Sequence, residues 1–69
     1  MNNRLEELRR ARGISQAELG TALEVSRQTI ISLERGRYNP SLLLAFKIAR
    51  YFDQPIDQIF LYAEDYERG

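Results

Sequence analysis

The sequence predicts an all-α fold built from five short helices, and three observations lead to this prediction. Apolar residues recur at the i, i+3 and i+4 spacing of one helical face, and no period-two alternation lasts more than a few residues. Serines that suit helix N-caps precede three of the apolar segments, at Ser15, Ser26 and Ser41. Helix-breaking residues divide the chain into short units, at Gly13, Gly36, Pro40 and Pro55.

A glycine separates the first two predicted helices. The first helix is expected over about residues 3–12, because its leucines lie on one helical face. It should end there because Gly13 fits a C-terminal cap. The second helix is expected to begin at Ser15. Ser15 and Glu18 have the spacing of a capping box, in which the hydroxyl and the carboxylate each accept a backbone N–H. The apolar stripe of this helix consists of Leu19, Ala22 and Leu23.

A short turn at residues 24–25 leads into a third helix, which Ser26 is expected to cap. The apolar residues Ile30 and Leu33 of this helix should face the core, and Gly36 should end it. Two short helices joined by a turn of about three residues can cross at about 90–120°. The second and third helices therefore have the layout of a helix-turn-helix.

A fourth helix is expected over residues 42–52, and its apolar residues lie nearly all round, which is typical of a central core helix. We expect its inward face to consist of Leu42, Ala45, Phe46, Ala49 and Phe52. Pro55 then starts a last short helix that extends to about Phe60. Residues 61–62 could continue as a short extended segment.

The charges divide the chain into a basic body and an acidic tail at about residues 63–69. Residues 1–52 carry nine basic and five acidic side chains, whereas residues 53–69 carry one basic and five acidic ones. The chain has neither Cys nor His, which excludes disulfides and removes the commonest metal ligand and general base. We therefore expect no enzyme, no metal and no cofactor. No apolar run approaches the ~20 residues of a membrane span, so we expect a cytoplasmic protein.

Four segments together carry a resemblance to a known family: SQAELG, VSRQTI, LERGRYNPSL and KIA. With them the chain resembles the Cro/C1-type (Xre) helix-turn-helix family of phage and bacterial repressors over about residues 4–60. Among short members it is most similar to the cytolysin-operon repressor type, which works as a homodimer. The resemblance implies a single compact five-helix domain of the lambda-repressor type over residues 1–69. The helix-turn-helix would occupy about residues 15–35.

The resemblance also implies roles for individual residues. Bases would be read by one face of the third helix, which presents Arg27, Gln28, Thr29, Ile31 and Ser32; arginine and glutamine can each make two hydrogen bonds to a base edge. DNA phosphates would be bound by Gln16, Ser26, Arg35, Arg37, Tyr38 and Asn39. Arg9 and Glu34 match an internal ion pair. The position of Glu24 is often glycine in this family, because the turn there tends to be left-handed, so either Glu24 is strained or this turn differs.

These inferences predict a regulator of transcription, most simply a repressor, that binds double-stranded DNA as a homodimer. Dimerisation is expected because a core this small rarely supplies more than ~3–5 kcal/mol by itself. The expected interface is an apolar patch of Leu43, Phe60, Leu61 and Tyr62. The alternative is an antitoxin-like module that binds a second protein through this patch and also binds its own promoter. We expect no domain for a small-molecule ligand.

Overall fold

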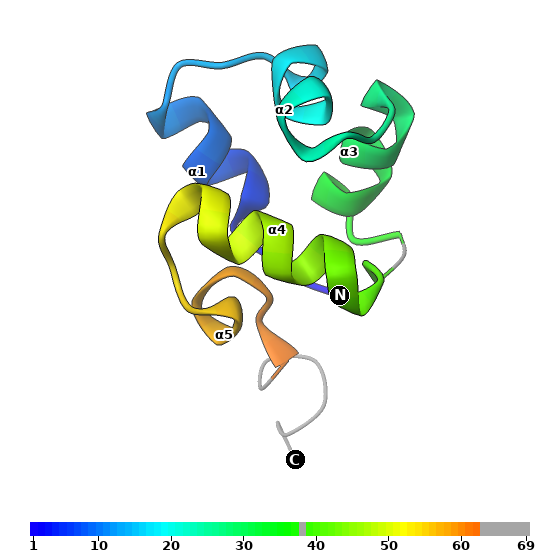
Figure 1. Ribbon diagram of the computed structural model, residues 1–69. Helices are drawn as coiled ribbons and strands as arrows, with labels where there is room; N and C mark the ends of the chain where they lie inside the picture. The colour runs from blue at the N-terminus through cyan, green and yellow to red at the C-terminus, as the bar shows by residue number, and fades with distance from the viewer. Residues whose placement is uncertain (38, 63–69) are drawn as a thin grey trace.

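Five helices follow one another in the computed structural model, which describes residues 1–37 and 39–62 (Figure 1). They are α1 (Leu5–Ala11), α2 (Gln16–Leu23), α3 (Arg27–Glu34), α4 (Leu42–Phe52) and α5 (Ile56–Ile59). This arrangement confirms the predicted all-α fold with five short helices. The predicted acidic tail at residues 63–69 lies outside the described residues. No helix in the described ranges has the length and apolar character needed to cross a membrane.

Three serines begin helices as the sequence predicted. Ser15, Ser26 and Ser41 are extended, and each side chain accepts a hydrogen bond from the backbone N–H three residues later. The capping box at α2 is complete, because Ser15 N donates to Glu18 Oε1 over 2.8 Å while Glu18 N donates to Ser15 Oγ over 3.0 Å. These caps fix where α2, α3 and α4 begin.

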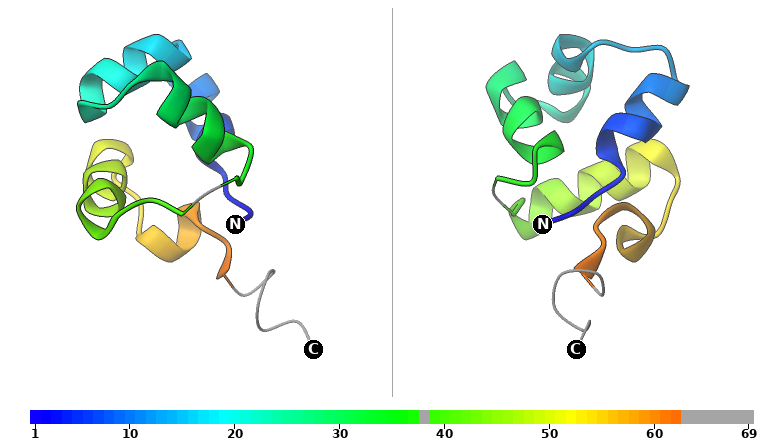
Figure 2. Two further views of the ribbon diagram at one scale, coloured as in Figure 1. Left: turned by 90° about the vertical axis from the view of Figure 1, so that its right-hand side faces the viewer. Right: turned by 180° about the vertical axis from the view of Figure 1, so that it is seen from behind.

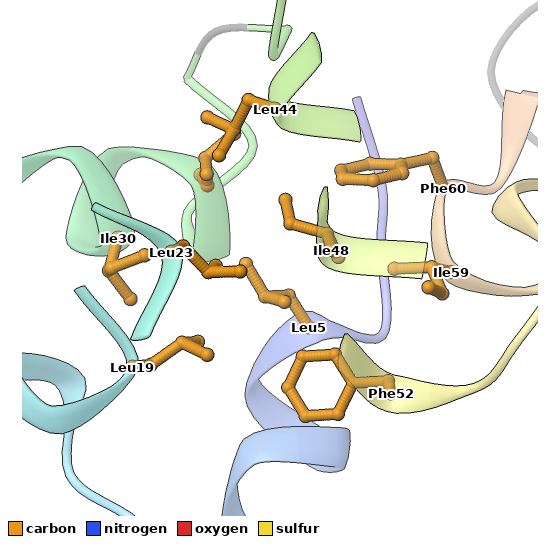
Figure 3. Close-up of a cluster of buried hydrophobic side chains, with 10 residues drawn as sticks. Leu5, Leu19, Leu23, Ile30, Leu44, Ile48, Phe52, Ile59 and Phe60 are labelled. Carbon is orange, nitrogen blue, oxygen red and sulfur yellow. The ribbon is translucent and has the colours of Figure 1, made fainter. Parts of the chain in front are cut away.

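The hydrophobic core draws side chains from all five helices (Figure 3). In this view Leu5 of α1 lies between the side chains from α2 and α3 on one side and those from α4 and α5 on the other. The buried residues of the cluster are Leu5, Leu19, Leu23, Ile30, Leu33, Leu44, Ile48, Phe52, Ile59 and Phe60. Since no helix buries its apolar face against one neighbour alone, the helix-turn-helix unit and the α4–α5 pair depend on one shared core.

The inward face of α4 differs from the sequence expectation. Leu44, Ala45, Ile48 and Phe52 are the buried residues of this helix. Leu42 and Phe46, which we expected inside, are 72% and 55% exposed. Because α4 is apolar nearly all round, its periodicity fits more than one rotation about the helix axis, and only packing selects one. Ala22 of α2 was also expected inside and is exposed.

Residues 1–4 form an extended arm that pairs with the segment following α5 (Figure 2). Arg4 N donates to Ile59 O over 2.8 Å, and Leu61 N donates to Asn2 O over 2.8 Å, on either side of an antiparallel bridge between Asn3 and Phe60. This pairing explains why α1 begins two residues later than expected. The extended residue is Phe60, one position before the extended segment expected at residues 61–62, and Tyr62 is helical.

Candidate nucleic-acid interface

The turn between α2 and α3 is left-handed at Glu24, which has φ 63° and ψ 40°. This conformation costs about 1–2 kcal/mol for a residue with a Cβ. The turn closes through a hydrogen bond from Val25 N to Gly20 O over 2.8 Å. Glu24 also accepts a 3.0 Å bond from Lys47 Nζ, which connects the turn to α4. The turn therefore keeps the left-handed geometry that the resemblance implied, with a residue that has a Cβ in place of glycine.

Gly20 allows the two helices of the motif to approach each other. A Cβ at this position would lie 2.8 Å from Val25 O and 3.4 Å from the carbonyl carbon of Ser26. Because backbone atoms surround the site, a larger residue could be accommodated only by moving α3 away from α2. Gly20 thus helps to set the position of α3.

α3 buries one face and presents the other. Ile30 and Leu33 are completely buried, while Arg27 and Gln28 are exposed and begin the outer face. Ile31 and Ser32 are partly exposed one turn further along. Thr29 is partly buried, and its hydroxyl lies 3.0 Å from Ser26 Oγ, which also accepts the Thr29 N–H over 3.1 Å. Thr29 therefore supports the N-cap of α3 in addition to its predicted role toward DNA.

The residues predicted to bind phosphate lie mainly at the two ends of the motif. Arg35, Arg37 and Asn39 are exposed after the end of α3, and Gln16 is partly exposed at the start of α2. Ser26 is exposed at the N-cap of α3, and Tyr38 lies outside the described residues. The placement leaves the cationic side chains accessible.

The chain leaves α3 through a Schellman motif. Gly36 has φ 69°, its N–H donates to Leu33 O over 3.0 Å, and Arg37 N donates to Ser32 O over 3.0 Å. These two bonds define the direction in which the loop after α3 begins.

A buried ion pair connects three helices behind this interface. Arg9 Nε lies 2.6 Å from Glu34 Oε2, and the two side chains are 10% and 4% exposed. The hydrogen bond to Glu34 raises the pKa of Arg9 above its already high ordinary value. Arg9 Nη1 also donates to Ile14 O over 2.9 Å, and Gln16 Nε2 donates to Glu34 Oε1 over 3.1 Å. The structure thus brings the expected partners Arg9 and Glu34 together, and it adds Gln16 to the same network.

The predicted dimer patch is only partly at the surface. Leu43 and Tyr62 are 66% and 52% exposed, and Leu61 is partly exposed. Phe60 is 7% exposed and packs in the core, so its expected place at an interface is corrected. Its pairing with Asn3 holds it there. Leu42 and Phe46 occupy the exposed face instead.

Comparison with known proteins agrees with this arrangement. A family model described as Helix-turn-helix matches residues 5–59. The chain is 49% identical over 65 residues to an uncharacterized HTH-type transcriptional regulator of Methanocaldococcus jannaschii, covering 94% of this chain and 98% of that one. It is 43% identical over 65 residues to such a regulator of Bacillus subtilis, with coverage of 94% and 98%.

Among solved structures, the chain is similar to the restriction-modification controller protein C.AhdI from Aeromonas hydrophila. The TM-score is 0.72 at 37% sequence identity, and the match covers 83% of each chain.

Proposed function

Because the chain belongs to the Helix-turn-helix family of DNA-binding transcriptional regulators, we propose that it is a repressor that occupies an inverted-repeat operator as a homodimer. The observation that carries this proposal is the outer face of α3. Arg27 and Gln28 are exposed at the start of a helix whose opposite face is fully buried. A helix in this position can enter the major groove and present its N-terminal residues to base edges.

The predicted base contacts and the predicted phosphate contacts have different roles. Arg27 suits a guanine and Gln28 an adenine, since each can make two hydrogen bonds to that base. Gln16 and Arg37 would bind phosphate, which sets the register of the protein on the duplex without selecting a sequence. Glu34 on α3 binds Gln16 of α2 and Arg9 of α1. Its carboxylate therefore fixes the helix that carries Gln16 relative to the helix that carries Arg27 and Gln28.

The homodimer is supported by the apolar outer face of α4. Leu42, Leu43 and Phe46 are each more than half exposed, which is unusual for adjacent large apolar residues on one helix. Next to them is an apolar groove of about 270 Å³, whose lining includes Pro40, Ala45, Ile56, Phe60 and Tyr62. We propose that a second copy covers this face, with Leu61 and Tyr62 at its margin. The resemblance to short cytolysin-operon repressors, which remains a prediction, favours the same assembly.

The proposal is tested by comparing Arg27→Ala with Arg37→Ala on an operator selected from a random DNA pool. Arg27→Ala should cost about 1–3 kcal/mol per base contact and relax the preference at one position in each half-site. Arg37→Ala should weaken all sequences alike and lower the slope of log K against log salt by about 0.9 per lost phosphate contact. Binding titrations on matched and single-base-altered operators, at several salt concentrations, separate the two. An unchanged base preference in Arg27→Ala would show that α3 does not determine the sequence specificity.

The exposed face of α4 also supports a second candidate, an antitoxin-like module. In that case another protein would cover Leu42, Leu43 and Phe46, and promoter binding would be a second activity of the complex. Purification from the native source distinguishes the two, because the antitoxin-like function requires a stoichiometric second chain, whereas the repressor requires only copies of this one.

A further inference from the structure

We propose that Asn3 is a positioning residue that holds the phosphate-binding loop after α3 in its DNA-binding conformation. The inference rests on the proposed function, since it assigns to that loop the phosphate contacts of Arg35 and Arg37. It concerns a side chain outside the helix-turn-helix, in the extended arm that precedes α1. Neither charge nor hydrophobic pattern in the sequence distinguishes this asparagine from its neighbour Asn2.

Both polar atoms of the Asn3 side chain bind backbone groups, in the arm itself, in α1 and in α3. Its Nδ2 donates to Leu33 O over 2.7 Å and to Met1 O over 3.1 Å. Its Oδ1 accepts from Leu5 N over 3.0 Å, which caps the start of α1. One amide thus connects the first turn of α1 with the last turn of α3, 30 residues away in the chain.

The bond to Leu33 O falls on the turn from which the loop departs. Leu33 O also accepts the Gly36 N–H of the Schellman motif, so the carbonyl has two donors. Gly36 packs against the arm so closely that a Cβ on it would lie 2.9 Å from Met1 O. Because Arg35 and Arg37 flank Gly36, the arm fixes the backbone that carries both exposed cations.

The arm can do this because its other edge is anchored. The hydrogen bonds of Asn2 O and Arg4 N to Leu61 and Ile59 pair it with the segment after α5, and Phe60 and Ile59 lie in the core. The end of α3 is therefore connected to the core through Asn3 and the arm, in addition to the contacts that α3 makes itself. An arginine that is already aimed at a phosphate loses less conformational entropy on binding than one on a loosely held loop.

Two substitutions separate positioning from capping. Asn3→Asp keeps an acceptor for Leu5 N but has no donor for Leu33 O, whereas Asn3→Ala loses both. Both variants should bind operator and unrelated DNA more weakly by roughly 3- to 10-fold, the range that one lost hydrogen bond gives. The salt slope should fall while the base preference set by Arg27 stays the same. Amide hydrogen exchange at Gly36 and Arg37 should accelerate relative to core amides of α4.

Ala11→Asp is the control for the added charge, because Ala11 is exposed on α1 and lies outside the arm, and it should bind DNA within about 2-fold of the wild type. A double-mutant cycle with Arg37→Ala adds a readout that general destabilisation would not move. The effect of Asn3→Ala should shrink when Arg37 is already absent, because the two residues act on one contact.

The outcomes separate this inference from the proposed function. If Arg37→Ala weakens binding but Asn3→Asp binds like the wild type, Asn3 only caps α1 and the inference is overturned. Equal losses in Ala11→Asp and Asn3→Asp, or strictly additive effects in the cycle, overturn it as well. If Arg37→Ala itself has no effect on DNA binding, the phosphate contact that the proposed function assigns to the loop after α3 is contradicted.

Discussion

The outer faces of α3 and α4 have opposite chemical character although both helices bury their inner faces in the same core. α3 presents Arg27 and Gln28, with the partly exposed apolar side chain of Ile31 one turn further along. α4 presents Leu42, Leu43 and Phe46 at 72%, 66% and 55% exposure. A polar face with a cation suits the wet, anionic surface of a duplex, whereas neighbouring exposed large apolar side chains are typical of a surface that binds another protein. The proposed function follows this difference, with DNA on the outer face of α3 and a second copy on the outer face of α4.

The two faces also differ in how they are attached. The end of α3 is held to α1 by the buried Arg9–Glu34 pair and to the arm by the bond from Asn3 Nδ2 to Leu33 O. The connection from α4 to the turn before α3 is the Lys47–Glu24 pair, whose side chains are 36% and 78% exposed. An exposed pair contributes only about 0–1 kcal/mol. Beyond the shared core, the end of α3 is therefore held by a buried ion pair, whereas the turn before α3 is linked to α4 by a weak exposed one.

The largest expected effect comes from the α4 face. Leu43→Glu combined with Phe46→Glu should convert the protein into a monomer. Each apolar side chain contributes about 1.5–3 kcal/mol when buried, and a twofold interface contains every residue twice. The dissociation constant should then rise by more than about 1000-fold, with a matching loss of operator affinity. Light scattering across a concentration series measures the change.

Ala11→Glu with Ala22→Glu is the control for this experiment, because both alanines are exposed and lie on other helices. It adds the same charge and should leave the dimer intact. A wild-type protein that is monomeric at about 50 μM would contradict the assignment of α4 to self-association.

The next effect concerns the buried pair behind α3. Arg9→Ala leaves the Glu34 carboxylate, only 4% exposed, without its cation, and should lower the free energy of unfolding by about 3–5 kcal/mol. Denaturant unfolding of both single variants and of the double variant measures the coupling between the two side chains. Lys47→Ala, which removes the exposed pair, should cost only about 0–1 kcal/mol. Arg9 and Glu34 effects that add within about 0.5 kcal/mol would mean that the two charges do not depend on each other.

The smallest effect is expected at the turn. Glu24→Gly removes a left-handed strain of about 1–2 kcal/mol but adds unfolded-chain entropy worth about 0.5–1 kcal/mol, and it removes the bond to Lys47. The net change should be neutral to slightly stabilising in thermal or denaturant unfolding.

Asp53→Gly is a matched comparison for the turn, because Asp53 is left-handed as well, with φ 53°, at the end of α4. Arg12→Gly is the opposite control, since Arg12 caps α1 in a right-handed conformation. It should destabilise the protein. A clear destabilisation by Glu24→Gly, of the size seen for Arg12→Gly, would show that Glu24 is not strained.

Local chemistry allowed much of this structure to be predicted from the sequence. Three serines and two glycines fix the starts of α2, α3 and α4 and the ends of α1 and α3 through local backbone geometry and bonds to residues within a few positions. The alternation of buried and exposed residues along α3 was predicted because its outer face is polar. The partnership of Arg9 with Glu34 came from the family resemblance, since nothing local connects residues 25 positions apart.

Only the tertiary structure decided three features that depend on contacts between segments far apart in the sequence. The rotation of α4 was mispredicted because leucines and a phenylalanine stand all round it, and only contact with the other helices buries Leu44 and exposes Phe46. Phe60 moved from an expected interface into the core because the arm pairs with it. The role of Asn3 depends on a carbonyl 30 residues away. Sequence patterns record the neighbours of a residue along one helix or turn, whereas these three placements were set by which segments meet in space, and no local periodicity encodes that.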